Sequence, residues 1–289
     1  MSTFVLYRYQ FAPIKDRTHS LAGNMNVDLP DDKLMEKKQE ILDDLLSVES
    51  SISFRNPKKQ KYEHRMLYNS DGFCIFRLAN TRKTRLEKHF VKQEETYSPS
   101  CLVIIDNRKD CQFIAIEKSN AFENSDAVCK ILQFTFGSIL ETEGLHIKIQ
   151  SMYESKDFWQ VVNAYEGKIK KVRFDFSYPN LPTLNRNVKE MIKSISQNTQ
   201  SAKSSLVFES EQGKALNIHS SDADMVNLAE AGADSGDEIK LGINGMRSSI
   251  SVGKTNRTME LDRIEEFLSG NLFQRGYDML CEKFNRLIR

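Results

Sequence analysis

The sequence predicts an α+β fold with a ferredoxin-like core, and three observations support this. Two apolar runs, residues 101–106 and 112–117, are separated by the polar segment 107–110, which is typical of a β-hairpin. An amphipathic helix follows from Ser125, and later segments alternate apolar and polar residues as strands do. With a short helix at 158–165 treated as an insertion, the order is strand–helix–strand–strand–helix–strand, which defines the split βαβ arrangement.

The core is expected to span residues 101–210. We expect Ser125 to cap its first helix and Gly144 to end it. The remaining core elements are strands at 145–149, 169–176 and 205–209 and a helix at 184–195.

Two further regions flank this core. Residues 1–100 are predicted to hold a strand at 4–11, a helix that opens at Pro30, a strand at 73–78 and a basic stretch. Residues 211–289 form the third region, a C-terminal α/β region. Its expected elements are an acidic segment with a helix at 225–231, a strand at 238–243, a Gly-rich loop at 242–257, and helices at 261–268 and 277–288.

Composition limits the classes of function. The 289 residues carry 41 Lys and Arg against 40 Asp and Glu, a net charge of +1, which excludes a uniformly basic nucleic-acid binder. No apolar run approaches the roughly 18 residues of a membrane span, so we expect no membrane insertion. The five cysteines are odd in number and lack metal-site spacing. Together with the absence of a secretory signal pattern, this predicts a cytoplasmic protein.

Charge is nevertheless concentrated in one stretch. Residues 54–92 contain eleven basic and three acidic residues, a local charge of +8, with six Phe and Tyr interleaved. Cations that neutralise phosphates, beside rings that stack on bases, are typical of nucleic-acid binding. A solvated loop and a helix with one basic face is the alternative. The predicted nucleic-acid contacts are Arg55, Lys58, Lys59, Lys61, Arg65, Arg82, Lys83 and Arg85.

The Gly-rich loop holds a second set of candidates. Gly253-Lys254-Thr255 looks like the end of a phosphate-binding loop, but Ser248 stands where the pattern needs its first glycine. Amides, hydroxyls and cations in this loop still suit a phosphate, and the predicted phosphate contacts are Arg247, Lys254 and Arg257. The alternative is a solvated hairpin with turn glycines.

Two acidic segments balance these cations. Residues 28–49 carry eight acids against three lysines, and residues 222–238 carry six acids and no base. Their spacing matches no calcium loop, so we expect soluble acidic surface or a partner-facing surface, with no metal and no cofactor. A nuclease or toxin site with Asp234, Glu238 and Lys240 is a further alternative, as is a ribonuclease-like pair of His64 and His89.

Several segments taken together resemble an uncharacterised bacterial family associated with mobile-element and phage-defence loci. They are Ile104-Ile105-Asp106-Asn107-Arg108, Ile114-Ala115-Ile116-Glu117, Phe158-Trp159, Phe174-Asp175-Phe176-Ser177-Tyr178-Pro179-Asn180, and the strand and loop at 239–254. The resemblance covers residues 70–257 and assigns no catalytic residue. It implies a component of an anti-phage defence or toxin system.

These observations favour a non-enzymatic accessory or effector component of a defence system that binds DNA or RNA through its basic stretch. Two alternatives remain open at this point: a protein-interaction subunit without nucleic-acid binding, and a metal-dependent nuclease or toxin. A partner protein subunit or a homo-oligomer is expected in either of the binding interpretations.

Overall fold

The computed structural model describes residues 2–14, 29–47, 52–88, 90–109, 111–177, 186–199, 201, 203–253, 255–262, 264, 266 and 273–287. The chain divides into two compact units. Unit 1 comprises residues 1–149 and 258–286, and unit 2 comprises residues 150–257 and 287–289. These two units are defined by their compactness. The three regions predicted from the sequence are defined by charge and residue pattern instead, so the division into three regions stays a prediction.

Unit 1 is built on an antiparallel sheet of eight strands in the order β14-β1-β8-β7-β4-β3-β2, with β9 paired to β1 beside this path. Its strands are β1 (Ser2–Pro13), β2 (Phe54–Arg55), β3 (Lys61–Ser70), β4 (Phe73–Ala79), β7 (Ser100–Asp106), β8 (Phe113–Glu117), β9 (Leu145–Ser151) and β14 (Thr258–Leu261). Its helices are α1 (Asp31–Leu46), α2 (Ser125–Leu140), the 3₁₀ turn η1 (Glu141–Glu143) and α7 (Phe273–Asn285). The last two residues of β9 belong to unit 2.

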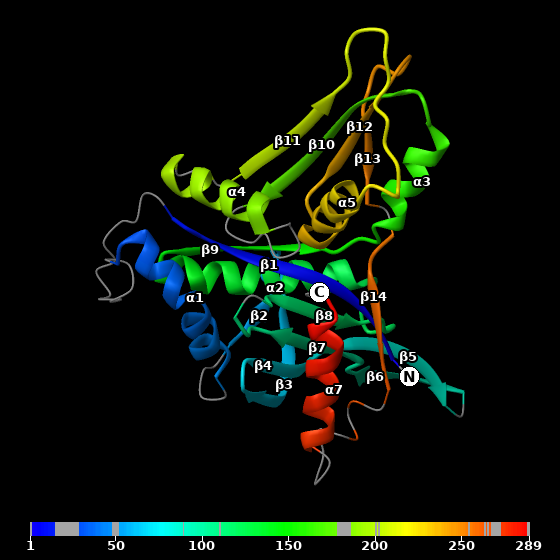
Figure 1. The fold of residues 1–289 in the computed structure, drawn as a ribbon. Coiled ribbons are helices and arrows are strands. Elements are labelled where there is room, and N and C mark those ends of the chain that lie inside the picture. The colour runs from blue at the N-terminus through cyan, green and yellow to red at the C-terminus, as the bar shows by residue number, and fades with distance from the viewer. Residues whose placement is uncertain are drawn as a thin grey trace. The chain divides into compact units, whose positions relative to one another are not determined.

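The inner face of this sheet forms the core of unit 1 with α1 and α2 (Figure 1). Alternate residues of β1, among them Tyr7 and Tyr9, point inward and pack with the apolar stripe of α2. The outward face is covered at one end by α7, where the ring of Phe284 lies 5.8 Å from that of Phe73. Burial of these apolar surfaces is the main favourable term in folding.

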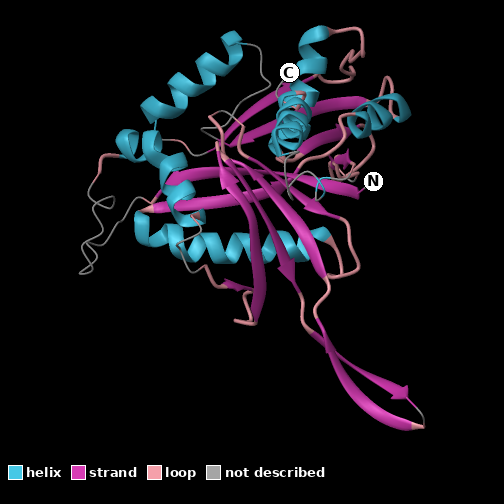
Figure 2. Ribbon diagram, turned by 90° about the horizontal axis from the view of Figure 1, so that it is seen from below, coloured by secondary structure: helices cyan, strands magenta, loops and turns pink. Residues whose placement is uncertain are grey.

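Two strands of the sheet continue beyond it as a narrow hairpin. β5 (Arg82–Lys88) pairs with β6 (Val91–Tyr97). The pairing of Ala79 with Ser100 in β4 and β7 keeps its register into the pairing of Arg82 with Tyr97. No residue is inserted on either side, so β5–β6 is a direct extension of β4–β7. Figure 2 shows this extension as a long ribbon that leaves the sheet, and we call it the arm.

Unit 2 holds a four-stranded antiparallel sheet in the order β11-β10-β12-β13. Its elements are α3 (Lys156–Ala164), β10 (Ile169–Ser177), α4 (Arg186–Thr199), β11 (Lys203–Glu209), α5 (Ala223–Ser235), β12 (Ile239–Ile243) and β13 (Ile250–Val252). Residues of the three helices, such as Phe158, Ile192 and Leu228, pack on one face of this sheet. Trp159 is packed against this core.

The predicted ferredoxin-like core is wrong. Its strands do not share one sheet: β7 and β8 lie in the larger sheet, β9 pairs with β1, and β10 and β11 pair within the sheet of unit 2. The predicted segments are mostly real, because alternation of side chains is a local property of a strand. Partner choice is not local, and β8 pairs with β1 from the beginning of the chain.

Two smaller expectations also change. The cap of α2 is Asn124, whose side-chain oxygen accepts a hydrogen bond from the backbone N–H of Ala127 at 2.9 Å, rather than Ser125. Gly144 follows η1 with a φ of 78°, so the expected glycine ends the helical segment one short turn after α2. Four of the eight residues of the predicted helix at 261–268 fall outside the described residues.

Candidate functional site

The predicted basic stretch is distributed over two structures in unit 1. Arg55, Lys61 and Arg65 lie at the sheet edge formed by β2 and β3, and Lys58 and Lys59 lie in the turn that joins these strands. The remaining predicted contacts, Arg82, Lys83 and Arg85, lie on β5 in the arm.

Strand register decides which of these cations share a face. Phe54 and Tyr62 point toward the core, so their neighbours Arg55 and Lys61 point outward, directly opposite each other. Arg65 also points outward, and it lies opposite Arg77 of β4.

The arm continues this outward face. Since the register is unbroken, Lys83 and Arg85 lie on the same side of the ribbon as Arg77. Between them, the hydroxyls of Thr81 and Ser98 are 2.9 Å apart. We call the six outward cations the basic face: they are Arg55, Lys61, Arg65, Arg77, Lys83 and Arg85.

Arg82 is separated from this group. Its guanidinium donates a hydrogen bond to the carbonyl of Ala121, and Ala121 belongs to the core on the opposite side of the sheet. Arg77, by contrast, joins the basic face although it was not among the predicted contacts. Only the register of β3 with β4 reveals it, because its sequence neighbours are apolar.

The basic face has an unusual electrostatic pattern. It contains two like-charged pairs across strands, Arg55 with Lys61 and Arg65 with Arg77, and such pairs are destabilising. Within the described part of the chain, no acid forms an ion pair with Arg55, Lys61 or Arg65. An anion lying over the face would relieve this repulsion.

The arm itself is less basic than residues 54–92 suggested. β6 brings Glu95 opposite Thr84 and Glu94 opposite Arg85, and Lys83 forms an ion pair with Glu94 at 3.5 Å. Both acids lie just beyond the end of the stretch counted from the sequence. The sheet edge also carries Glu63, which lies on the outward side of β3 between Lys61 and Arg65, so this edge has an excess of cations rather than cations alone, and the arm adds a smaller share.

The second predicted set, in the Gly-rich loop, is not brought together. Arg247 lies in the exposed turn between β12 and β13, whereas Arg257 follows the other end of β13 and forms an ion pair with the buried carboxylate of Asp234. Lys254 lies outside the described residues. Gly245 in the turn has a φ of 84°, and β12 pairs with β13 in antiparallel fashion, so the loop contains a hairpin with a turn glycine.

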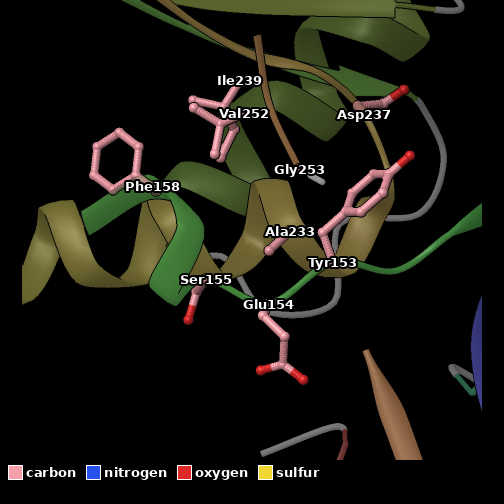
Figure 3. A pocket seen from close by; sticks show the side chains of 9 residues that line it. All are labelled: Tyr153, Glu154, Ser155, Phe158, Ala233, Asp237, Ile239, Val252 and Gly253. Carbon is pink, nitrogen blue, oxygen red and sulfur yellow. The ribbon is translucent and has the colours of Figure 1, made fainter. Parts of the chain in front are cut away.

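Backbone conformation and packing explain why residue 253 is a glycine. Its φ is 109°, and a Cβ at this position would lie 2.8 Å from the ring of Tyr153. Tyr153 and Gly253 line a small pocket with Glu154, Ser155, Phe158, Ala233, Asp237, Ile239 and Val252 (Figure 3). The volume in this pocket that the centre of a water molecule can occupy is about 10 Å³. That is room for about one water and far less than a small-molecule substrate needs.

The acidic segment at 222–238 is only partly surface. Asp234 is paired with Arg257, and Asp237, which is also buried, accepts a hydrogen bond from the side chain of Gln150 at 3.3 Å. Glu238 is exposed and forms an ion pair with Lys240 at 2.6 Å. Among the residues that the structure describes, no group of three or more His, Cys, Asp or Glu side chains is placed to hold a metal ion.

The outward face of the sheet in unit 2 is charged but compensated. Asp175, whose side chain is 2% exposed, lies 2.7 Å from Arg173 Nε and 3.2 Å from Lys203 Nζ, and Ser205 Oγ donates to it at 2.6 Å. Burial raises the pKa of Asp175, and the hydrogen bonds from Ser205, Arg173 and Lys203 outweigh burial, so its pKa lies below its ordinary value. Each cation of this cluster therefore has an acid beside it.

Thiol chemistry has no support at four of the cysteines. Burial raises the pKa of Cys101, Cys111 and Cys129 to about 12 and that of Cys74 further still. Since the thiolate is the nucleophilic form, these side chains act as small apolar residues.

The geometry thus defines a two-unit α+β protein whose larger sheet carries a basic face, in which Arg55, Lys61 and Arg65 form no ion pair with a described residue. Residues 108–241 match the family model described as "Domain of unknown function (DUF4747)". The match lies inside residues 70–257, for which the sequence predicted a resemblance to an uncharacterised family, and it carries no link to mobile elements or phage defence. No curated protein matches the chain.

The matched segment contains the charged cluster of unit 2 and none of the basic face of unit 1. It includes Arg173, Asp175, Lys203 and Asp234, and it contains none of the eleven predicted contact residues. Separately, none of the helices in the described part of the chain combines the length and apolar character that crossing a bilayer requires.

Proposed function

We propose that the protein is a nucleic-acid-binding component that holds the phosphate backbone of DNA or RNA on the basic face of unit 1. The observation that carries this proposal is the pair of like-charged cross-strand contacts, Arg55 with Lys61 and Arg65 with Arg77. Repulsion across both pairs lowers the stability of the free protein, and phosphates turn the same cations into favourable contacts.

The arm extends this surface. Lys83 and Arg85 lie on its side of the ribbon, and two-stranded ribbons are among the elements that proteins place against nucleic acid. Because the contacts are to phosphates, the binding is expected to be weakly sequence-dependent and strongly salt-dependent.

The biological setting is the second part of the proposal. We place the protein as an accessory component of a bacterial defence assembly, on the resemblance of its segments to a family found at such loci. The identity of the neighbouring genes tests this part separately, and housekeeping genes on both sides would contradict it.

The binding proposal is tested with full-length protein and fluorescently labelled 30-nucleotide DNA and RNA, single- and double-stranded, across a series of salt concentrations. The triple variant Arg55→Glu, Lys61→Glu and Arg65→Glu is expected to lose most of its affinity. The slope of log affinity against log salt is expected to become shallower by about one for each phosphate contact removed.

A charge-matched control separates a local effect from the change in net charge. Lys171→Glu, Lys214→Glu and Lys240→Glu reverse three cations of unit 2 that already have acidic partners, and this variant is expected to keep nearly all of the affinity. If both triple variants bind as the wild type does, or both lose affinity equally, the basic face is not the binding surface.

A further inference from the structure

The tip of the arm carries an exposed aromatic residue. β5 and β6 pair up to Lys88 and Val91, so the strands are joined by a two-residue turn whose second residue is Phe90. The side chain of Phe90 is 97% exposed, and its φ is 64°.

The turn requires the positive φ but not a phenylalanine side chain. Two-residue hairpin turns use left-handed backbone positions that favour Gly, Asn or Asp, and a bulky residue there is strained. A fully exposed ring also returns no packing energy to the arm. Strained residues persist at places where they have a functional contact, so the turn and the exposure together indicate a ring that contacts something outside the chain.

The charges of the arm favour one kind of partner. Lys83 and Arg85 lie along the ribbon behind the ring, and the three residues of strand that follow Arg85 up to Lys88 span roughly 10 Å. That length matches about three stacked nucleotides at 3.4 Å each. A ring and cations at this spacing can contact a base and the backbone of the same strand.

We propose that Phe90 stacks on the face of an unpaired nucleobase while the basic face holds the adjoining backbone. This inference rests on the proposed function and adds single-stranded or locally opened nucleic acid as its substrate class. An anionic membrane is the less favourable partner, because even one fatty acyl chain gives only marginal membrane binding and a single phenyl ring buries less apolar surface.

The test uses full-length Phe90→Gly. Glycine suits the left-handed turn, so this variant is expected to fold at least as well as the wild type in thermal unfolding. Its affinity for a 12-nucleotide single strand is expected to be about tenfold weaker. Removing the bases at the central positions, by abasic substitution, should weaken the wild type by a similar factor and the variant only slightly.

Controls assign each outcome. Met246→Gly removes another exposed apolar residue from a hairpin turn, in unit 2, and is expected to bind as the wild type does. Fluorescence of 2-aminopurine within the strand should be quenched by the wild type and not by Phe90→Gly. A fully paired duplex of the same sequence is expected to show little difference between wild type and variant.

Three results would overturn the inference. If Phe90→Gly binds normally while the basic-face triple variant does not, the stacking contact is wrong and the proposed function stands. If the basic-face variant also binds normally, the proposed function fails as well. If Phe90→Gly loses binding to phosphatidylserine vesicles and keeps its binding to oligonucleotides, the ring is a membrane contact.

Discussion

The outward faces of the two sheets differ in how they treat the same arrangement of charge. Both place like charges opposite each other on neighbouring strands: Arg65 with Arg77 in unit 1, and Arg173 with Lys240 in unit 2. In unit 2 each cation has its own acid, since Arg173 pairs with Asp175 and Lys240 pairs with Glu238.

Unit 1 lacks this compensation at its sheet edge. Among the described residues, Arg55, Lys61 and Arg65 form no ion pair. Each of these cations of unit 2 is therefore paired within the chain, whereas three cations at the sheet edge of unit 1 have no ion pair among the described residues. Counting charges along the sequence does not distinguish the two faces, and cross-strand register does.

The largest expected effect is the removal of the central acid in unit 2. Asp175→Ala leaves Arg173 and Lys203 without their shared carboxylate and removes the acceptor of the Ser205 hydrogen bond. We expect unit 2 to lose about 2 kcal/mol of stability, because hydrogen bonds to a charged group contribute about 1.5–3 kcal/mol. Urea denaturation with hydrogen exchange resolved for β10 and β11 measures this loss.

The control for this variant is Glu209→Ala, which breaks the exposed pair with Lys171. Exposed pairs contribute about 0–1 kcal/mol, so its effect should be much smaller. Equal losses in the two variants would show that the buried carboxylate does not organise this face.

A smaller effect is expected from acid. The pKa of Asp175 is lowered in the folded protein, so its stabilising contribution is present above the unfolded pKa of about 3.9 and is lost as pH falls through the lower folded pKa. The difference in unfolding free energy between wild type and Asp175→Ala should therefore be constant near neutral pH and shrink below about pH 4. A difference that grows on acidification would contradict the sign of the shift.

The smallest effects come from single charge reversals, and they should have opposite signs in the two units. Arg65→Glu removes the repulsion with Arg77 and is expected to stabilise unit 1 by about 0.2–1 kcal/mol. Lys171→Glu places an acid opposite Glu209 and is expected to destabilise unit 2 by a similar amount. Local hydrogen exchange in β3 and β10 reports the two changes separately, and destabilisation by Arg65→Glu would remove the argument for an uncompensated face.

Some elements were predictable because their signal is local. The strand at 169–176 and the helix that begins at Ser125 follow from alternation and from an apolar stripe, and both are present. The strands β3, β5 and β6 were not found, because their exposed faces and many charges hide the alternation that a half-buried strand shows.

The sequence predicted the positive charge of the candidate site but not which residues belong to it. The basic stretch does contain most of the basic face, yet Arg82 points to the other side and Arg77 joins the group. β6 places Glu94 and Glu95 in the arm. The positive charge near Arg85 is therefore lower than the count over residues 54–92 indicated. The sequence indicated a phosphate contact near Gly253. Only the packing of the Tyr153 ring against Gly253 shows that this position needs a glycine for structural reasons.

By itself, the sequence determined where segments form and which side of each strand is apolar, because both depend on periods of a few residues. It also determined that positive charge is concentrated at residues 54–92. The tertiary structure alone decided that the strands of residues 101–210 belong to two sheets, which cations lie opposite one another, and that Phe90 stands at the tip of an arm. The physical reason is that strand pairing joins residues far apart in the chain, and any two apolar strands satisfy the local pattern equally well.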